Sequence, residues 1–188
     1  MTRTAGPAAK ASDGAPCSGR GPDILKDLEQ AREVSIGSGV VVVGLGNVLL
    51  KDEGVGVHVA HALRKARPTG GDGFDVIDGG TSPEVFHLVE RARKLVLVDA
   101  ASGGGEPGSV YRFHPEDIIP EGKSDFSVHQ IDLMASLRMM ELSRSRPDEV
   151  VIIGIEPKEI GWGLELSPEL SDKLPEIIKV VMDEVKSK

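Results

Sequence analysis

The stretch VVVVGLGNVLLKDEGVGV, residues 40–57, decides the fold of this chain. It opens with four valines, and an unbroken β-branched run of this kind is typical of a strand covered on both faces, as in a parallel sheet. A glycine-containing loop follows, and the apolar residues over 54–66 recur at helical spacing. A strand, a loop and a helix in this order predict a unit that continues, through a right-handed crossover, into a parallel strand.

The rest of the chain repeats this alternation of apolar runs and helical patterns. We expect further strands at 74–78, 94–98, 150–153 and, as a short edge strand, 109–113. We expect further helices at 83–92, after His129, and from Pro168 to about Val185 with Ser167 as N-cap. The alternation predicts an α/β protein, with helices on both faces of a mostly parallel sheet.

Composition separates a leader from a folded domain. A chain of 188 residues suits one domain. Residues 1–21 are rich in Ala, Gly, Ser and Pro, and residues 22–34 have helical spacing before a linker of Gly and Ser. We therefore expect a disordered or weakly helical leader over 1–38 and a single domain over 39–188.

Charge and cysteine content argue against several classes of partner. The formal net charge of −8 disfavours nucleic acid, because binding a phosphate backbone needs clustered Lys and Arg. The only cysteine, Cys17, has no second thiol for a disulfide or a metal cluster, which favours the cytoplasm. No apolar run approaches the roughly 18 residues of a membrane span, and the N-terminus lacks the apolar core of a secretory signal. We therefore expect a soluble protein with no membrane partner.

The loop Gly44–Asn47 supports two interpretations. It follows the first strand, as the phosphate-binding loop of a dinucleotide-binding domain does. The third glycine of that motif is missing, because position 49 is Leu, which weakens the nucleotide-binding interpretation. The alternative is that two glycines simply permit a tight turn after the strand.

Acidic residues cluster where the predicted strands and their following loops end. Asp52 and Glu53 directly precede the first helix, Asp78 closes the second strand, and Asp99 closes the third. The carboxyl ends of parallel strands meet at one edge of a sheet, and ligands bind beyond that edge. We therefore expect these acids to lie near one another. The structural alternative is that Asp52 caps the helix, that Glu53 only decorates its first turn, and that the strand-end acids stabilise loops.

His129 differs from the other four histidines. It lies after a long polar segment, at the predicted start of a helix, where it can project inward from the loop. Together with Glu53 and Asp99 it gives two carboxylates and an imidazole, which suit zinc or nickel and leave a coordination position open. Taken alone, His129 has a structural alternative. The default for the helical histidines is a solvated or partly buried neutral role; these are His58, His61 and His87.

These residues lie in segments that resemble the hydrogenase maturation endopeptidases. The resemblance runs from residue 40 to about residue 185 and departs from the family in the leader, because members usually begin close to the first strand. The similar segments occur in the family's order and are 44–57, 78–81, 98–100, 107–108, 127–130, 154–157 and 166–168.

The resemblance implies a fold, a reaction and a site. The fold would be a three-layer α/β/α sandwich with a mostly parallel twisted sheet. The reaction would be endopeptidase removal of the C-terminal extension from the large-subunit precursor of a nickel-iron hydrogenase, with nickel already inserted. Glu53, Asp99 and His129 match the family's metal-binding positions, and Asp78, Gly79 and Gly80 match a loop that faces the substrate.

The resemblance also bears on mechanism. The chain lacks a Ser-His-Asp arrangement and Cys17 lies outside the similar region, so we expect no side-chain nucleophile. The three ligands would recognise nickel held by the precursor's cysteines, and a polarised or carboxylate-assisted water would cleave the peptide bond. Nickel would come with the substrate, no organic cofactor is expected, and the family's description as aspartic-type fits only loosely. Two alternatives remain, a nucleotide-binding module and a hydrolase of similar architecture acting on another substrate.

Overall fold

A computed structural model of the protein describes residues 39–66, 73–82, 89, 92–117, 137–142 and 146–187. Several expectations therefore lie outside the described residues. They concern the leader over 1–38 with Cys17, most of the expected helix over 83–92, His87, and His129 with the start of its helix. No helix among the described residues combines the length and the hydrophobicity that a membrane span requires.

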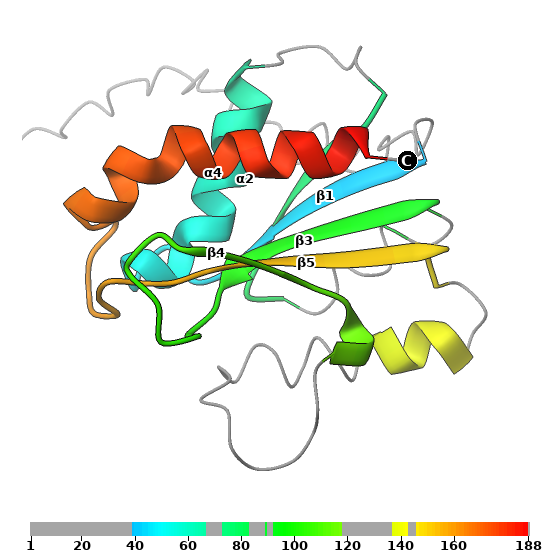
Figure 1. The fold of residues 1–188 in the computed structure, drawn as a ribbon, viewed down its shortest axis with the longest axis horizontal. Coiled ribbons are helices and arrows are strands. Elements are labelled where there is room, and N and C mark those ends of the chain that lie inside the picture. Colours follow the sequence, from blue (N-terminus) through cyan, green and yellow to red (C-terminus); the bar gives the residue numbers. More distant parts are fainter. Residues whose placement is uncertain are drawn as a thin grey trace, which may run out of the picture. The chain divides into compact units, whose positions relative to one another are not determined.

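The described residues form one mixed sheet of five strands (Figure 1). The strands are β1 (Val40–Leu45), β2 (Asp75–Gly80), β3 (Lys94–Ala100), β4 (Val110–Phe113) and β5 (Glu149–Ile155). Their order is β2-β1-β3-β5-β4, and only β4 runs antiparallel to its neighbour. The predicted parallel strands are confirmed, and so is the edge position of the strand at 109–113.

Two helices cover one face of the sheet. They are α2 (Val55–Ala66) and α4 (Pro168–Lys186), and short 3-10 turns occur at η1 (Asp52–Gly54) and η3 (Pro115–Asp117). The predicted cap of α4 is confirmed, because the Ser167 side chain accepts a hydrogen bond from the Leu170 N–H. Val40 and Val42 of β1 pack into the core beneath these two helices.

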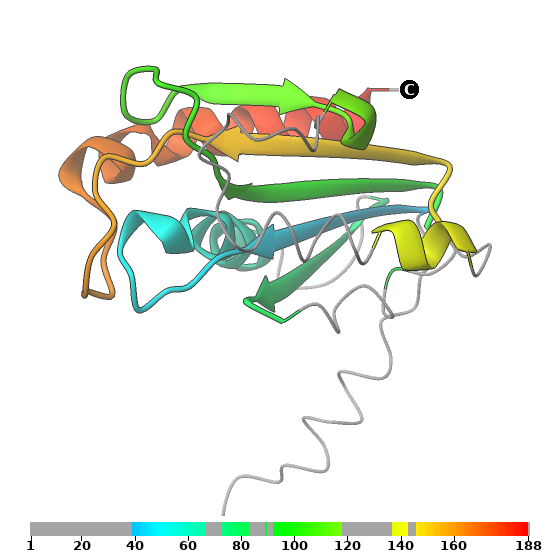
Figure 2. The ribbon, with the colours of Figure 1, turned by 90° about the horizontal axis from the view of Figure 1, so that it is seen from below.

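The opposite face carries the second core. There Val41 and Val43 pack with residues of the helical segment 137–142, including Leu137 and Met140. Figure 2 shows this segment, coloured yellow, in front of the sheet, while α4 lies behind it. The even and odd residues of β1 thus face two different helical layers, as alternation along a strand requires. The expected α/β sandwich is confirmed.

Glycines let α2 begin directly against the strands. A Cβ atom at Gly56 would overlap the carbonyl oxygens of Val98 in β3 and Leu45 in β1, and one at Gly44 would overlap the carbonyl of Gly56. The helix backbone therefore rests on the strand backbones with no side chain between them. This close approach holds η1, at the start of α2, against the carboxyl end of the sheet.

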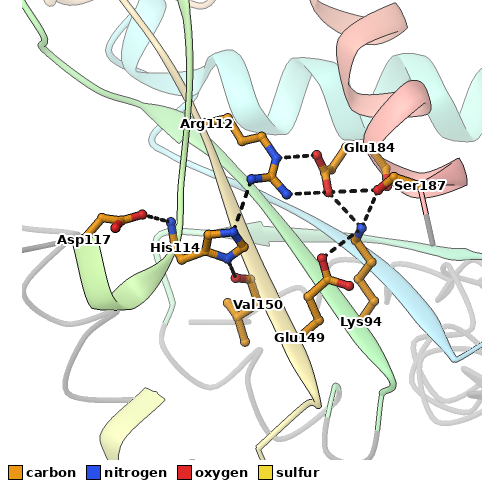
Figure 3. Close-up of polar contacts among 8 residues, drawn as sticks. All are labelled: Lys94, Arg112, His114, Asp117, Glu149, Val150, Glu184 and Ser187. Carbon is orange, nitrogen blue, oxygen red and sulfur yellow. Dashed lines mark hydrogen bonds and ion pairs between the residues drawn. The ribbon is translucent and has the colours of Figure 1, made fainter.

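A buried charged network fastens α4 at the other end of the sheet (Figure 3). Lys94, at the start of β3, is fully buried and lies 2.8 Å from Glu184 and 3.2 Å from Glu149. Arg112 of β4 donates to both carboxylate oxygens of Glu184, and Ser187 accepts from Lys94. Because every charge in this group has an opposite partner, the network links α4 to three strands without leaving an isolated buried ion.

Candidate active site

Two of the three expected metal ligands lie at the carboxyl edge of the sheet. Glu53 lies on η1, which packs against β3, and Asp99 is the penultimate residue of β3. Asp99 is buried, and its Oδ1 accepts a 2.8 Å hydrogen bond from the Ala100 N–H. Glu53 Oε2 and Asp99 Oδ2 are both shielded from solvent. These two carboxylates therefore occupy the edge where the parallel topology placed them.

The complete ligand set stays a prediction. His129 lies outside the described residues, and within the described ranges no three side chains of His, Cys, Asp or Glu are grouped as a metal site. Glu53 and Asp99 alone provide oxygen ligands, which need a third donor to hold a borderline ion such as zinc or nickel. The chemistry of the described pair is compatible with the expected set of three.

Asp78 lies at the end of the edge strand β2 and is exposed. Its Oδ2 is 2.7 Å from Nε2 of His61 on α2, and its Oδ1 accepts a hydrogen bond from the Gly80 N–H. The Gly80 carbonyl in turn accepts from the Gly46 N–H, which ties this loop to the loop after β1. The segment Asp78–Gly80 thus borders the same edge as Glu53. Its contact with a substrate stays a prediction.

Asp52 has a structural role that the sequence did not predict. Its side chain is fully buried and accepts backbone hydrogen bonds from Lys158 at 2.9 Å, Glu159 at 3.0 Å and Ser167 at 2.7 Å. The structural alternative that Asp52 caps the first helix is therefore wrong. Lys51 holds the cap position of η1 and makes no capping side-chain bond. The Asp52 carboxylate instead supports a loop that is more than a hundred residues distant.

Glu156 is a second buried acid with a role that sequence analysis missed. It follows β5, and its Oε2 accepts from the N–H groups of Gly103 and Gly105 and from the Tyr111 hydroxyl. Burial by itself raises the pKa of Glu156, but these hydrogen bonds lower it below its ordinary value. The signal was present, since an acid directly after a buried strand is the pattern that singled out Asp99.

His58 projects from α2 toward the loop after β5. Burial lowers its pKa, against a backbone hydrogen bond to Leu164 that raises it, and the net direction is downward. The imidazole is therefore favoured in its neutral form, as expected for a partly buried histidine in a helix. Its Nε2 is buried without a hydrogen-bond partner in the described part of the chain.

The loop after β1 packs closely against η1 and is held by a hydrogen bond within the loop itself. A Cβ atom at Gly46 would overlap the carbonyl oxygen of Glu53, and Gly46 has a φ of +122°, which favours glycine. The Asn47 side chain accepts a hydrogen bond from the Leu49 N–H within the same loop. The glycines therefore allow a turn and a close approach to η1, which favours the tight-turn interpretation over nucleotide binding.

Known proteins resemble this chain in sequence and in fold. A family model described as hydrogenase maturation protease matches residues 57–184. The hydrogenase expression/formation protein HupD of Thiocapsa roseopersicina is 30% identical over 150 residues, which are 77% of this chain and 66% of that protein. The hydrogenase 2 maturation protease of Escherichia coli is 26% identical over 145 residues, 76% of this chain and 88% of that protein.

A solved structure has a fold similar to that of this chain. The hydrogenase maturating endopeptidase HybD from E. coli matches with a TM-score of 0.68 at 24% identity, over 78% of this chain and 91% of that chain. Since the family model covers more than half of the sequence, the protein belongs to the hydrogenase maturation protease family. This membership supports peptidase activity.

Proposed function

We propose that this protein is an endopeptidase that removes the C-terminal extension from the nickel-loaded large-subunit precursor of a nickel-iron hydrogenase. Family membership and the names of the relatives support a role in hydrogenase maturation. The observation that carries the proposal is the pair Glu53 and Asp99. Both are acids at the ligand-binding edge of the sheet, and both have a carboxylate oxygen shielded from solvent.

Glu53, Asp99 and His129 are proposed to complete the coordination of nickel that the precursor brings. Two carboxylates and one imidazole, with no thiolate, form an open set that binds a free borderline ion less tightly than a closed site with four ligands does. Nickel held by precursor cysteines has soft ligands of its own. Cleavage would then depend on successful metal insertion, and the protease would act as a checkpoint on the maturation of the precursor.

The cleavage step is proposed to be hydrolysis by water. A carboxylate at the edge accepts a proton from water as the water oxygen attacks the carbonyl carbon of the scissile peptide. The C–N bond then breaks, and the departing nitrogen takes up a proton to leave as an amine. The segment Asp78–Gly80 lies at the same edge and is proposed to contact the precursor chain on either side of the cleaved bond. The proposed compartment is the cytoplasm, on the basis of cysteine usage.

Site variants test the ligand assignment. Glu53→Gln, Asp99→Asn and His129→Ala are each expected to leave the precursor unprocessed, while circular dichroism shows a folded protease. Asp172→Asn, an exposed position on α4, is the matched control and is expected to process the precursor normally. Full processing by all three site variants would contradict the assignment.

Metal dependence is tested on the substrate. Metal-stripped protease is mixed with nickel-loaded and with nickel-free precursor, and loss of the tail is followed by mass spectrometry. Only the nickel-loaded precursor is expected to be cut. Equal rates on both precursors, or a strict requirement for zinc added to the protease beforehand, would overturn the checkpoint proposal.

A further inference from the structure

A group of large apolar side chains is exposed beside the candidate active site. On the loop after β5, Trp162 is 83% exposed, Leu164 64% and Ile160 56%. Leu49, on the loop after β1, is 49% exposed. We call these four residues the apolar lip. The other exposed large apolar residues in the described ranges lie on the helical segment 137–142, as Met139 and Leu142, and on α4, as Val180.

The backbone of the apolar lip is firmly held, although its side chains face solvent. Lys51 N–H donates to the Gly163 carbonyl and Gly163 N–H donates to the Leu49 carbonyl, each at 3.0 Å. A second bridge joins Lys51 to Ile160. Beneath the lip, the buried Asp52 carboxylate fixes the start and the end of the β5 loop. A surface ordered in this way loses little conformational entropy when a partner binds.

Most charged side chains next to the apolar lip lie beside a partner of opposite sign, and the exposed Glu165, next to Leu164, adds one negative charge. Lys51 lies 2.6 Å from Glu159, and Lys158 lies 3.7 Å from Glu169. The lip therefore presents no strong field of one sign that would select a charged partner. Its chemistry matches an apolar segment of a polypeptide.

The lip is continuous with the edge where the substrate is proposed to bind. Lys51, which pairs with Ile160, is two residues before Glu53 in the sequence. In both ribbon views the loop after β1, cyan, and the loop after β5, orange, lie side by side at the carboxyl end of the sheet (Figures 1 and 2). A precursor chain held at Glu53 and Asp99 would therefore pass close to the lip.

The size of the lip argues against a stable dimer. Four partly exposed large side chains offer on the order of 500 Å² of apolar surface, given about 150–250 Å² for an aromatic residue. A stable interface buries about 800 Å² on each partner. An area of this size that includes a tryptophan instead suits the energetic centre of a transient contact.

We propose that the apolar lip is a docking surface for the precursor, and that it binds an apolar segment of the precursor chain next to the cleaved bond. The inference rests on the proposed function and deepens it by assigning a contact that the metal ligands do not make. Binding at the lip positions the substrate and takes no part in the chemical step. Loss of the lip should therefore raise KM and leave kcat nearly unchanged.

Kinetics on the nickel-loaded precursor test the proposal. Trp162→Ser, alone and combined with Leu164→Ser, is expected to raise KM by about tenfold or more, with kcat within about twofold of wild type. Leu142→Ser is the matched control. Leu142 is 81% exposed, but its helical segment 137–142 packs on the face of the sheet opposite to α2 and α4. It is expected to behave as wild type. A wild-type KM for the double variant would overturn the docking surface while leaving the proposed function intact.

A binding measurement separates the remaining outcomes. Trp162 is the only tryptophan in the chain, so full-length protease labelled with 5-fluorotryptophan gives one fluorine resonance. Unlabelled nickel-loaded precursor is expected to shift or broaden this resonance. A change that depends on protease concentration alone would show that a second copy occupies the lip, which would overturn the proposal. Failure of wild-type protease to cut or bind any such precursor would instead refute the proposed function, and the docking role with it.

Discussion

The buried carboxylate of Asp52 accepts a 2.7 Å hydrogen bond from the backbone N–H of Ser167, which lies 115 residues further along the chain. Ser167 is itself the N-cap of α4. One carboxylate thus joins η1, where Glu53 lies, to the first turn of a helix from the other end of the domain. Hydrogen bonds to an ionised acceptor are roughly twice as strong as neutral ones, so this contact is an effective link.

Asp52→Asn should therefore destabilise the domain. Asparagine is neutral and offers an NH2 group where backbone donors now point, which leaves at least one buried N–H without an acceptor. We expect the free energy of unfolding to fall by about 2 to 4 kcal/mol, measured by urea denaturation. Asp172→Asn, on the exposed face of α4, is expected to change stability by less than about 0.5 kcal/mol. Equal stability of the two variants would contradict the linking role of Asp52.

The close approach of α2 to the sheet gives a second prediction. A side chain at Gly56 would have to displace the backbones of β1 and β3, so Gly56→Ala should cost at least about 1 to 3 kcal/mol and reduce the yield of folded protein. Gly161→Ala is the matched control, because nothing lies within 4 Å of a Cβ atom at that position. Thermal unfolding of both variants is the measurement, and a Gly56→Ala melting temperature equal to that of Gly161→Ala would refute the packing argument.

Much of the fold could be predicted because its strands are unbroken apolar runs. An unbroken apolar run leaves the water on both faces of the sheet only if both faces are covered. The structure buries all residues of two such runs, Val40–Val43 and Val150–Ile153. The short strand β4 was correctly expected at an edge. Lys94 was included in a predicted strand, but nothing in the sequence showed that a lysine at its start would be fully buried. Its partner Glu184 is 90 residues away.

The sequence predicted a site residue only where a chemically suitable side chain ends a strand whose place in the sheet the topology fixes. Asp99 ends an apolar strand, and a parallel sheet fixes where such an end must lie. The position of Glu156 directly after a strand could have singled it out, as it did Asp99, but the partners of Asp52 and Glu156 are distant groups that local sequence does not identify. The apolar lip was missed for a different reason. Its residues lie in loops, where apolar residues do not recur at the regular spacing that identifies helices and strands.

Tyr111 gives a prediction that can be measured optically. Its hydroxyl donates a 2.6 Å hydrogen bond to Glu156, and this bond, with burial, raises the pKa of Tyr111 above its ordinary value of 10.0. It is the only tyrosine in the chain, so absorbance near 295 nm, where tyrosinate absorbs, reports it alone. Glu156→Gln removes the negative charge and should move the midpoint back toward 10.0. An unchanged midpoint would show that the pair does not persist in solution.

Glu184 contributes to the dependence of stability on acid. Hydrogen bonds from Arg112, and the proximity of Lys94, lower the pKa of Glu184 from 4.5 to about 2, although burial opposes the shift. The folded protein therefore binds fewer protons at this site than the unfolded chain does between about pH 4.5 and pH 2. The stabilisation is complete above pH 4.5 and is lost as pH falls toward 2. Its full size is about 3 kcal/mol, at about 1.4 kcal/mol for each pKa unit.

Glu184→Gln tests this dependence. At pH 7 the variant should be less stable than wild type by about 3 kcal/mol or more, because the buried Lys94 keeps only Glu149 as an acidic partner. At pH 3.5 the wild type should have lost about 1.4 kcal/mol of its advantage, so the two urea-unfolding curves move together as the solution is acidified. Glu176→Gln, an exposed position on α4, is the control and should follow the wild type at both pH values. A gap between wild type and Glu184→Gln that stays constant from pH 7 to pH 3.5 would mean that the contribution of the network of Lys94, Arg112 and Glu184 does not depend on ionisation of the carboxylate.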